Sequence, residues 1–300
     1  MSAHPPKAAG SRTRRSGSPE ESPDQTATKP SKAGRDLKAA IGIGVLLAVL
    51  ALGSLLIVKE AFLVLVVLVM SIGVWEIARA LRSVHVRVPI VPVIIGGAVM
   101  IVVAYVQGAE AQIVALGLTV VAVIVWRVAD GYNGALKDVG GGAFATLYPC
   151  FLGAFVSLLL AAPDGHLRVI FFILVTVFSD IGGYAVGVFF GKHPMAPSVS
   201  PKKSWEGFAG SVLTCAVIGA AAMNAFWPEA TWWYGGIIGA GAAFVATIGD
   251  FIESSIKRDL GIKDMGTILP GHGGVMDRID SLIMTAPLLW LALSFAVPLA

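Results

Sequence analysis

The sequence has few cysteines and few charged residues for its length. Only two cysteines, Cys150 and Cys215, occur in 300 residues, and both lie inside apolar segments far apart in the sequence. We expect both to be buried small side chains, which excludes a disulfide framework and a cysteine-based zinc site. Charged residues make up 14% of the chain and the mean hydropathy is +0.80. These two values exclude an ordinary soluble domain.

Long hydrophobic runs take the place of the missing charge. Runs of roughly 20 apolar residues recur along the chain, and a helix of that length crosses the hydrocarbon core of a bilayer. The sequence therefore predicts an all-α polytopic membrane protein with about nine transmembrane helices. The expected spans are residues 37–58, 61–82, 88–107, 111–128, 143–162, 169–190, 208–227, 232–256 and 279–298.

The first 36 residues differ from the rest of the chain. They are rich in Pro, Ser, Lys and Arg and have almost no large apolar residue, which predicts a disordered, basic cytoplasmic tail. A signal peptide is not favoured, because the first apolar run begins only near Leu37 and has full span length. With the amino terminus inside, the Lys and Arg residues of the later connections also face the cytoplasm, except for Lys59 and Arg168. This asymmetry follows the positive-inside rule and puts the carboxyl terminus on the opposite side.

This topology places two polar connections, residues 191–207 and 257–274, on the same cytoplasmic face. We therefore divide the chain into the tail, amino-terminal transmembrane helices at 37–168, and a catalytic transmembrane region at 169–300. Charge is concentrated in residues 249–281, which hydrophobic sequence borders on both sides. Any chemistry of the protein is expected there.

Carboxylates in this stretch recur at helical spacing. Residues i, i+3 and i+4 share one face of a helix, and this spacing relates two sets, Asp250, Glu253, Ser254 and Lys257, and Asp277, Asp280 and Ser281. Two such faces at neighbouring helix ends suit Mg²⁺, which binds through one or two carboxylates plus substrate phosphates. We predict Asp250 and Asp277 as its ligands and leave a second cation open. The alternative is that these are charges solvated at helix ends, which is the interpretation favoured for Glu253 and Asp259.

Further polar residues stand out against the apolar background. Asp180 lies in the middle of the span 169–190, where a charge is costly unless it faces a cavity, a metal or a partner. Lys202 and Lys203, in the segment SPKKSWEG, suit phosphates, although they could equally be topology anchors. His272 lies in a GHGG turn whose backbone N–H groups suit an anion, with a solvated loop histidine as the alternative. Glu76 is read as the partner of Arg79 in a structural ion pair.

These segments together resemble a known signature. Ser254-x-Ile256-Lys257-Arg258, then Lys263-Asp264-x-Gly266, Leu269-Pro270-x-His272-Gly273-Gly274 and Asp277-Arg278-Ile279-Asp280 are similar to the signature of phosphatidate cytidylyltransferases (CDP-diacylglycerol synthases). The resemblance is close over residues 180–281. The earlier spans match only in hydropathy and in Trp75-Glu76.

The resemblance implies an enzyme of phospholipid biosynthesis that condenses CTP with phosphatidic acid, releasing pyrophosphate. It further implies Mg²⁺, membrane lipids as partners, no nucleic acid, and a bacterial-type inner (plasma) membrane with the active site facing the cytoplasm. A homodimer is left open. The site residues it implies are Asp180, Lys202, Lys203, Asp250, Ser254, Lys257, Arg258, Lys263, Asp264, His272, Asp277, Arg278 and Asp280.

Two other classes are weighed against this interpretation. A CDP-alcohol phosphotransferase is also a metal-dependent membrane enzyme with aspartates at helix ends, but its longer aspartate-rich motif is absent here. A secondary transporter could use Asp180, but it should show paired broken helices in corresponding halves of the chain, and the sequence has no such symmetry.

Overall fold

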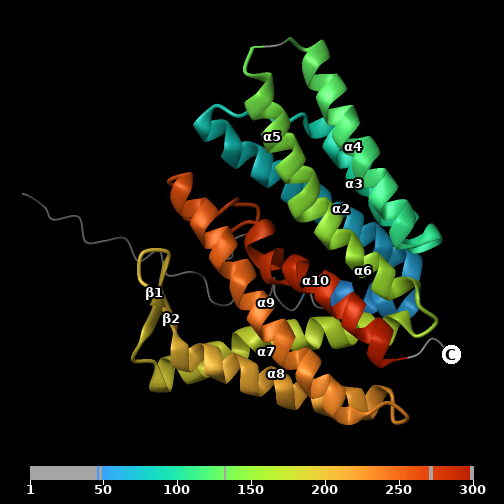
Figure 1. The fold of residues 1–300 in the computed structure, drawn as a ribbon, viewed down its shortest axis with the longest axis vertical. Helices are drawn as coiled ribbons and strands as arrows, with labels where there is room; N and C mark the ends of the chain where they lie inside the picture. The colour runs from blue at the N-terminus through green and yellow to red at the C-terminus, as the bar shows by residue number, and fades with distance from the viewer. Residues whose placement is uncertain (1–45, 47–48, 132, 270–272, 298–300) are drawn as a thin grey trace, which may run out of the picture. The chain divides into compact units, whose positions relative to one another are not determined.

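The computed structural model describes residues 46, 49–131, 133–269 and 273–297. Almost every described residue of the hydrophobic runs is helical (Figure 1). The elements in chain order are α2 (Lys59–Leu81), the 3₁₀ turn η1 (Arg82–Val84), α3 (Ile90–Gln107), α4 (Ala109–Ala129), α5 (Ala135–Ala145), the π-helical turn η2 (Thr146–Phe151), α6 (Leu152–Ala161), α7 (Gly165–Phe190), β1 (Pro194–Ala196), β2 (Ser200–Ser204), α8 (Trp205–Phe226), α9 (Trp232–Asp259) and α10 (Met276–Ala296).

The described helices agree with the expected spans. Eight of them are long and apolar enough to cross a membrane, and each overlaps one of the eight predicted spans from 61–82 onward. The predicted span 37–58 lies largely outside the described residues, although its residues 49–57 are helical. The count of nine and the sides of the two termini stay predictions, as does the disordered tail, which is also outside the described residues. The predicted boundary at 168/169 falls inside one unit, residues 35–300.

One predicted boundary was wrong. The span expected to begin at residue 143 begins at Ala135 and continues through η2 and α6. The charges and glycines of residues 137–142 read as a loop, but Asp138 is buried and pairs with Arg127 at 2.6 Å. Gly142 lies close to Val123, where an added Cβ would come within 2.6 Å of a side-chain carbon. The segment is therefore helical because tertiary packing overrides its local composition.

Glycines bring α7, α8 and α9 into close contact. A Cβ on Gly239 would lie 2.1 Å from the backbone oxygen of Cys215, so these two helices touch through their backbones. Small residues at such contacts let membrane helices pack tightly without a large side chain between them. Figure 1 shows α7 and α8 lying side by side, with α9 and α10 next to them.

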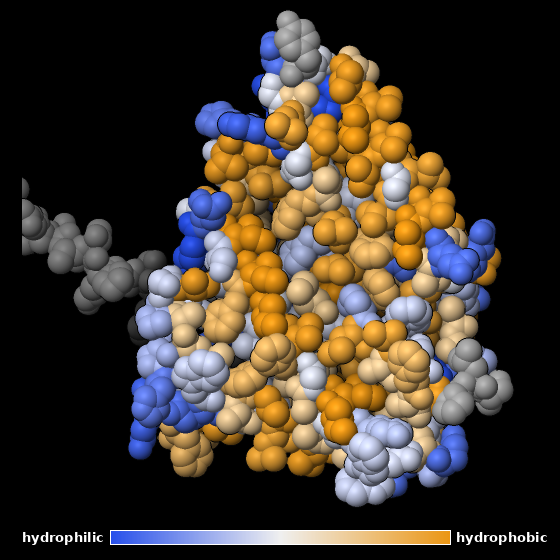
Figure 2. All heavy atoms as spheres, in the orientation of Figure 1, coloured by the Kyte–Doolittle hydropathy of each residue, from blue (hydrophilic) through white to orange (hydrophobic). Residues whose placement is uncertain are grey.

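The outward-facing side chains are strongly apolar. Figure 2 shows hydrophobic residues covering most of the visible face of the helices. Residues such as Val106, Leu118 and Phe295 are more than half exposed. A surface of this kind is stable in contact with lipid tails and unstable in water. The chain is a multi-pass membrane protein.

Candidate active site

A cavity of about 300 Å³ opens where α7, α8 and α9 meet the β1–β2 hairpin. It joins residues that are far apart in the sequence, because α7 and α9 flank α8 and the hairpin lies between α7 and α8 in the chain. Four residues that the sequence predicted as site residues line it, and these are Asp180, Lys202, Lys203 and Asp250. The cavity is therefore the place where the two hairpin lysines meet the carboxylates of α7 and α9.

The α7 wall of the cavity carries the mid-span carboxylate. Asp180, Tyr184 and Gly187 all line the cavity, as expected for residues on one face of a helix. The next helix approaches this wall closely, because a Cβ on Gly207 of α8 would lie 2.9 Å from the backbone oxygen of Gly183 on α7. Asp180 therefore faces a cavity, as its position in the middle of a span predicted.

The hairpin is fixed to the start of α8 by one carboxylate. Glu206 accepts backbone N–H bonds from Lys192 at 3.0 Å and His193 at 3.2 Å, and its other oxygen lies 2.5 Å from the His193 ring. At the other end of the hairpin, Ser204 caps α8 by accepting from the N–H of Gly207. The hairpin therefore leaves the helices at a fixed position, with its two lysines over the cavity.

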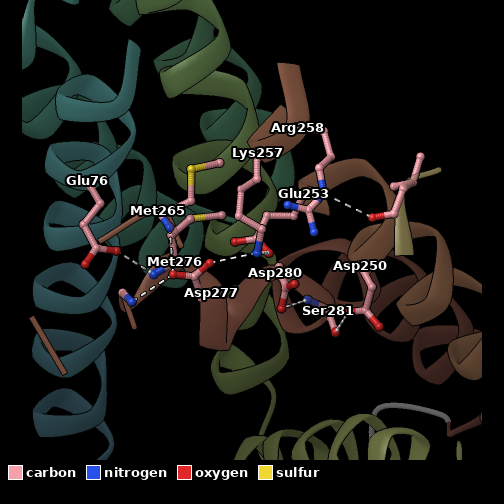
Figure 3. Close-up of polar contacts among 12 residues, drawn as sticks. Glu76, Asp250, Glu253, Lys257, Arg258, Met265, Met276, Asp277, Asp280 and Ser281 are labelled. Atoms are coloured by element: carbon pink, nitrogen blue, oxygen red, sulfur yellow. Dashed lines mark hydrogen bonds and ion pairs between the residues drawn. The ribbon is translucent and has the colours of Figure 1, made fainter. Parts of the chain in front are cut away.

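Asp250 is the meeting point of three elements. Lys203 of the hairpin donates to one of its carboxylate oxygens, and the Ser281 hydroxyl of α10 donates to the other. The Lys203 ammonium also lies 5.1 Å from the Phe251 ring centre. Asp280 lies beside Asp250 and Glu253, close enough for the charges to act on one another. Figure 3 shows these side chains of α9 and α10 pointing toward each other.

Lys257 and Asp277 form the second half of this cluster. The Lys257 ammonium lies 2.5 Å from Glu253 and 2.8 Å from Asp277. The other Asp277 oxygen accepts the backbone N–H groups of Met265 at 2.9 Å and Gly274 at 2.8 Å. Asp277 thus joins the end of α9, the following loop and the start of α10 (Figure 3).

The remaining predicted site residues lie around this cluster or outside it. Arg258 donates to the carbonyl of Val199 at 3.5 Å and so connects α9 to the hairpin turn. Asp264 is exposed, with one oxygen 3.3 Å from the place where a Cβ on Gly273 would lie. Ser254 is half-buried, whereas Lys263 and Arg278 are exposed. His272 lies outside the described residues.

Two expectations about carboxylates were wrong. Glu253, expected to be solvated, is 1% exposed, although Asp259 is exposed as expected. Glu76 does not pair with Arg79, whose guanidinium lies over the Trp75 ring. Glu76 accepts backbone N–H groups at the start of α10. Helical spacing favoured an ion pair between Glu76 and Arg79. The contact of Glu76 with α10, about 200 residues away, left only one sign in the sequence, which is a charge within an apolar span.

The cluster offers carboxylate oxygens, the type of ligand that Mg²⁺ prefers. Among the residues that the structure describes, no group of three or more His, Cys, Asp or Glu is placed to hold a metal alone. The buried Glu253 Oε1 atom accepts no N–H or O–H donor and lies against the carboxyl group of Asp280. A positive ion bound here would satisfy both carboxyl groups, and Mg²⁺ takes one or two carboxylates together with phosphates and water.

Comparison with known proteins gives the family. Residues 38–296 match the model of the family described as "Cytidylyltransferase family". The chain belongs to the cytidylyltransferase family. The match covers both the amino-terminal helices and the charged region, so the likeness extends well beyond residues 180–281. The predicted tail, residues 1–36, lies outside the matched residues.

Individual members of the family are similar over nearly the whole chain. A protein of Mycobacterium bovis named phosphatidate cytidylyltransferase is 36% identical over 296 residues, covering 93% of this chain and 96% of its own length. Proteins of the same name from Mycobacterium leprae and Pseudomonas aeruginosa are each 34% identical, covering 90% and 85% of this chain and 91% and 98% of their own lengths.

Proposed function

We propose that this chain transfers the cytidylyl group of CTP to phosphatidic acid, giving CDP-diacylglycerol and pyrophosphate. The observation that carries the proposal is the cavity in which Asp180, Lys202, Lys203 and Asp250 meet at the end of membrane helices. It suits one substrate anchored in the bilayer and one soluble polyanion. The relatives named phosphatidate cytidylyltransferase, similar over nearly their full length, support the same substrates.

The reaction needs two phosphates to approach each other. A phosphate oxygen of phosphatidic acid attacks the α-phosphorus of CTP, the bond from that phosphorus to the bridging oxygen breaks, and pyrophosphate leaves with the electron pair. Mutual repulsion of the two anions is the main obstacle, so cationic side chains and fixed positions supply most of the catalysis. Lys202 and Lys203 are the cavity lysines placed to do this. Lys257 is already held between Glu253 and Asp277, so it orders the carboxylates.

Asp250 and Asp277 are the proposed magnesium ligands, as the sequence predicted. We add Asp280, which the sequence analysis already named as a site residue, because its charge acts on Asp250. When bound, the ion neutralises charge on the CTP phosphates and on the departing pyrophosphate. In the chain itself, Lys203 neutralises Asp250. If a bound cation neutralised Asp250 instead, the Lys203 ammonium would be free to bind a substrate phosphate.

The proposed setting is the inner membrane of a bacterium, with the cavity facing the cytoplasm where CTP is made. Lys59 and Arg168 support this orientation, because both lie at the opposite end of the helices, around the connection from α6 to α7. There Lys59 donates to the carbonyl of Ala162, and Arg168 pairs with Asp164. A homodimer is the assembly to test first, by the mass of the protein in nanodiscs.

The position of a radiolabel tests the proposed reaction. The purified chain is incubated with phosphatidic acid, Mg²⁺ and CTP labelled at the α- or the γ-phosphorus. The proposal predicts lipid-soluble label from α-labelled CTP and labelled pyrophosphate from γ-labelled CTP. Consumption of added CDP-diacylglycerol with release of CMP would point instead to a CDP-alcohol phosphotransferase, and the absence of any turnover would favour a transporter.

The two cavity lysines, Lys202 and Lys203, are expected to raise kcat/KM for CTP. A hydrogen bond to a charged group contributes about 1.5–3 kcal/mol. The double variant Lys202→Gln plus Lys203→Gln should therefore have a lower kcat/KM for CTP, by a factor of at least about ten for each lysine. Lys192→Gln is the matched control, because Lys192 is exposed and contributes only its backbone N–H to the hairpin. Unchanged constants in the double variant would leave these lysines as topology anchors.

Asp180 is expected to act inside the cavity through its charge. Asp180→Asn keeps the size and most of the hydrogen-bonding capacity of the side chain but removes that charge. We predict a fall in kcat of about tenfold or more, with a changed dependence on Mg²⁺ concentration. Asp130→Asn, at the exposed end of α4, is the control. Wild-type turnover with an unchanged Mg²⁺ dependence would make Asp180 a structural residue.

A further inference from the structure

Glu76 of α2 is a completely buried carboxylate that reaches the catalytic region from the other half of the chain. Its exposed fraction is 0%. One oxygen accepts the backbone N–H of Val275 at 3.0 Å, and the other accepts that of Met276 at 2.8 Å. These donors are 199 and 200 residues away in the sequence. Figure 3 shows Glu76 pointing from α2 to the start of α10.

The Glu76 carboxylate lies so close to two glycines that neither position has room for a side chain. An added Cβ on Gly266 would lie 2.1 Å from Oε1 of Glu76, and one on Gly274 would lie 2.6 Å from Oε2. Both glycines belong to the loop that leads from α9 to α10. The loop therefore closes around the Glu76 carboxylate on two sides.

The start of α10 lacks a cap from its own sequence. The residue before the helix is Val275, which has no polar side chain and makes no side-chain cap hydrogen bond. The first N–H groups of a helix have no partner within the helix, and a buried N–H without a partner is costly. Glu76 supplies the missing acceptors, and its negative charge is favourable at the positive end of the helix dipole.

We infer that Glu76 is a positioning residue for the reaction, and this inference rests on the proposed function. It fixes the first turn of α10, and Asp277 follows Met276 directly. Asp277 in turn accepts from Lys257, Met265 and Gly274. Asp280 lies one helical turn further along, beside Asp250. Displacement of this turn moves both α10 carboxylates relative to those of α9, and a displacement of about 1 Å is enough to cost on the order of 100-fold in rate.

Glu76→Gln in the full-length chain tests the inference. Glutamine has nearly the same size, but its NH₂ group would face one of the two N–H donors in place of an acceptor. We expect kcat to fall roughly 10- to 100-fold, with the KM for phosphatidic acid changed by less than about threefold. Amide hydrogen exchange should rise in peptides that span residues 273–279 and stay unchanged in peptides of α7 and α8. Glu60→Gln is the control, because it makes the same change on the same helix far from this loop.

A second variant keeps the test decisive if Glu76→Gln does not accumulate in the membrane. Gly266→Ala places a methyl group against Glu76 Oε1 without removing the carboxylate, so it should produce the same fall in kcat and the same local exchange. Gly140→Ala is its control, since a Cβ on Gly140 meets nothing within 4 Å.

The outcomes separate this inference from the proposed function. A wild-type chain without CDP-diacylglycerol synthesis would overturn the proposed function. An active wild type together with wild-type kcat in Glu76→Gln, or in Gly266→Ala, would overturn the positioning role. A rise in the KM for phosphatidic acid with unchanged kcat would also overturn it, because that result assigns Glu76 to substrate binding.

Discussion

Asp250→Asn should abolish turnover, with a loss of at least about 1,000-fold, equivalent to roughly 4 kcal/mol of transition-state stabilisation. Asp250 is the carboxylate that the hairpin lysine, the α10 serine and the cavity share. Asparagine can keep its oxygen toward Lys203 while its NH₂ group donates to the Ser281 hydroxyl, so the helices should stay in place. What disappears is the negative charge that a magnesium ion requires. The measurement is the rate of CDP-diacylglycerol formation at saturating CTP over a range of Mg²⁺ concentrations.

A matched variant on the same helix isolates the effect of position. Asp259→Asn removes one negative charge from α9, but Asp259 is exposed and nine residues further along. It should retain turnover within about threefold of wild type, because a surface charge contributes little. If Asp250→Asn reached near-normal rates at saturating Mg²⁺, the carboxylate would not be a ligand and the proposed metal site would be wrong.

Asp277→Asn is expected to have the second largest effect, a fall in kcat of at least about 100-fold. Asp277 accepts three donors, from Lys257, Met265 and Gly274. An amide can accept at only one of its two positions, so the variant leaves a buried donor facing an NH₂ group. The change therefore removes a proposed metal ligand and loosens the loop between α9 and α10.

The dependence on Mg²⁺ separates these two roles of Asp277. A ligand role predicts that the Mg²⁺ concentration for half-maximal rate rises in Asp277→Asn. Loss of kcat with an unchanged Mg²⁺ dependence would assign Asp277 to loop structure alone and would leave Asp250 and Asp280 as the carboxylates for the metal. Asp130→Asn again serves as the exposed control.

Local sequence patterns predicted the elements whose determinants are themselves local. Span length and hydropathy located eight helices, because any apolar run of about 20 residues satisfies its backbone in a bilayer only as a helix. The position of Asp180 in the middle of an apolar span predicted that it faces a cavity, a metal or a partner, and it lines the cavity together with Asp250. Helical spacing put Asp277 and Asp280 on one face of α10, because residues i and i+3 lie on the same side of a helix.

The contacts that the sequence did not reveal are those between distant segments. Glu76 and Arg79 have ideal spacing for an ion pair, yet Glu76 is committed to backbone donors about 200 residues away. Glu253 read as a solvated charge because nothing in the sequence of its own helix shows that α10 packs against it. The early start of α5 depended likewise on Arg127 reaching Asp138. Burial and pairing partners are set by tertiary packing, and one sequence does not display them.

The central claim is that phosphatidic acid attacks CTP directly in the cavity beside Asp250, without a cytidylyl group on the protein. Exchange of labelled pyrophosphate into CTP tests this claim most directly. The purified chain is incubated with CTP, Mg²⁺ and labelled pyrophosphate, with or without CDP-diacylglycerol and phosphatidic acid. The account predicts exchange when the lipids are present, through reversal of the reaction, and none when they are absent. Labelled CTP formed without any lipid would reveal a covalent cytidylyl intermediate, for which the Ser281 hydroxyl next to Asp250 would be the first residue to examine, and would contradict the account.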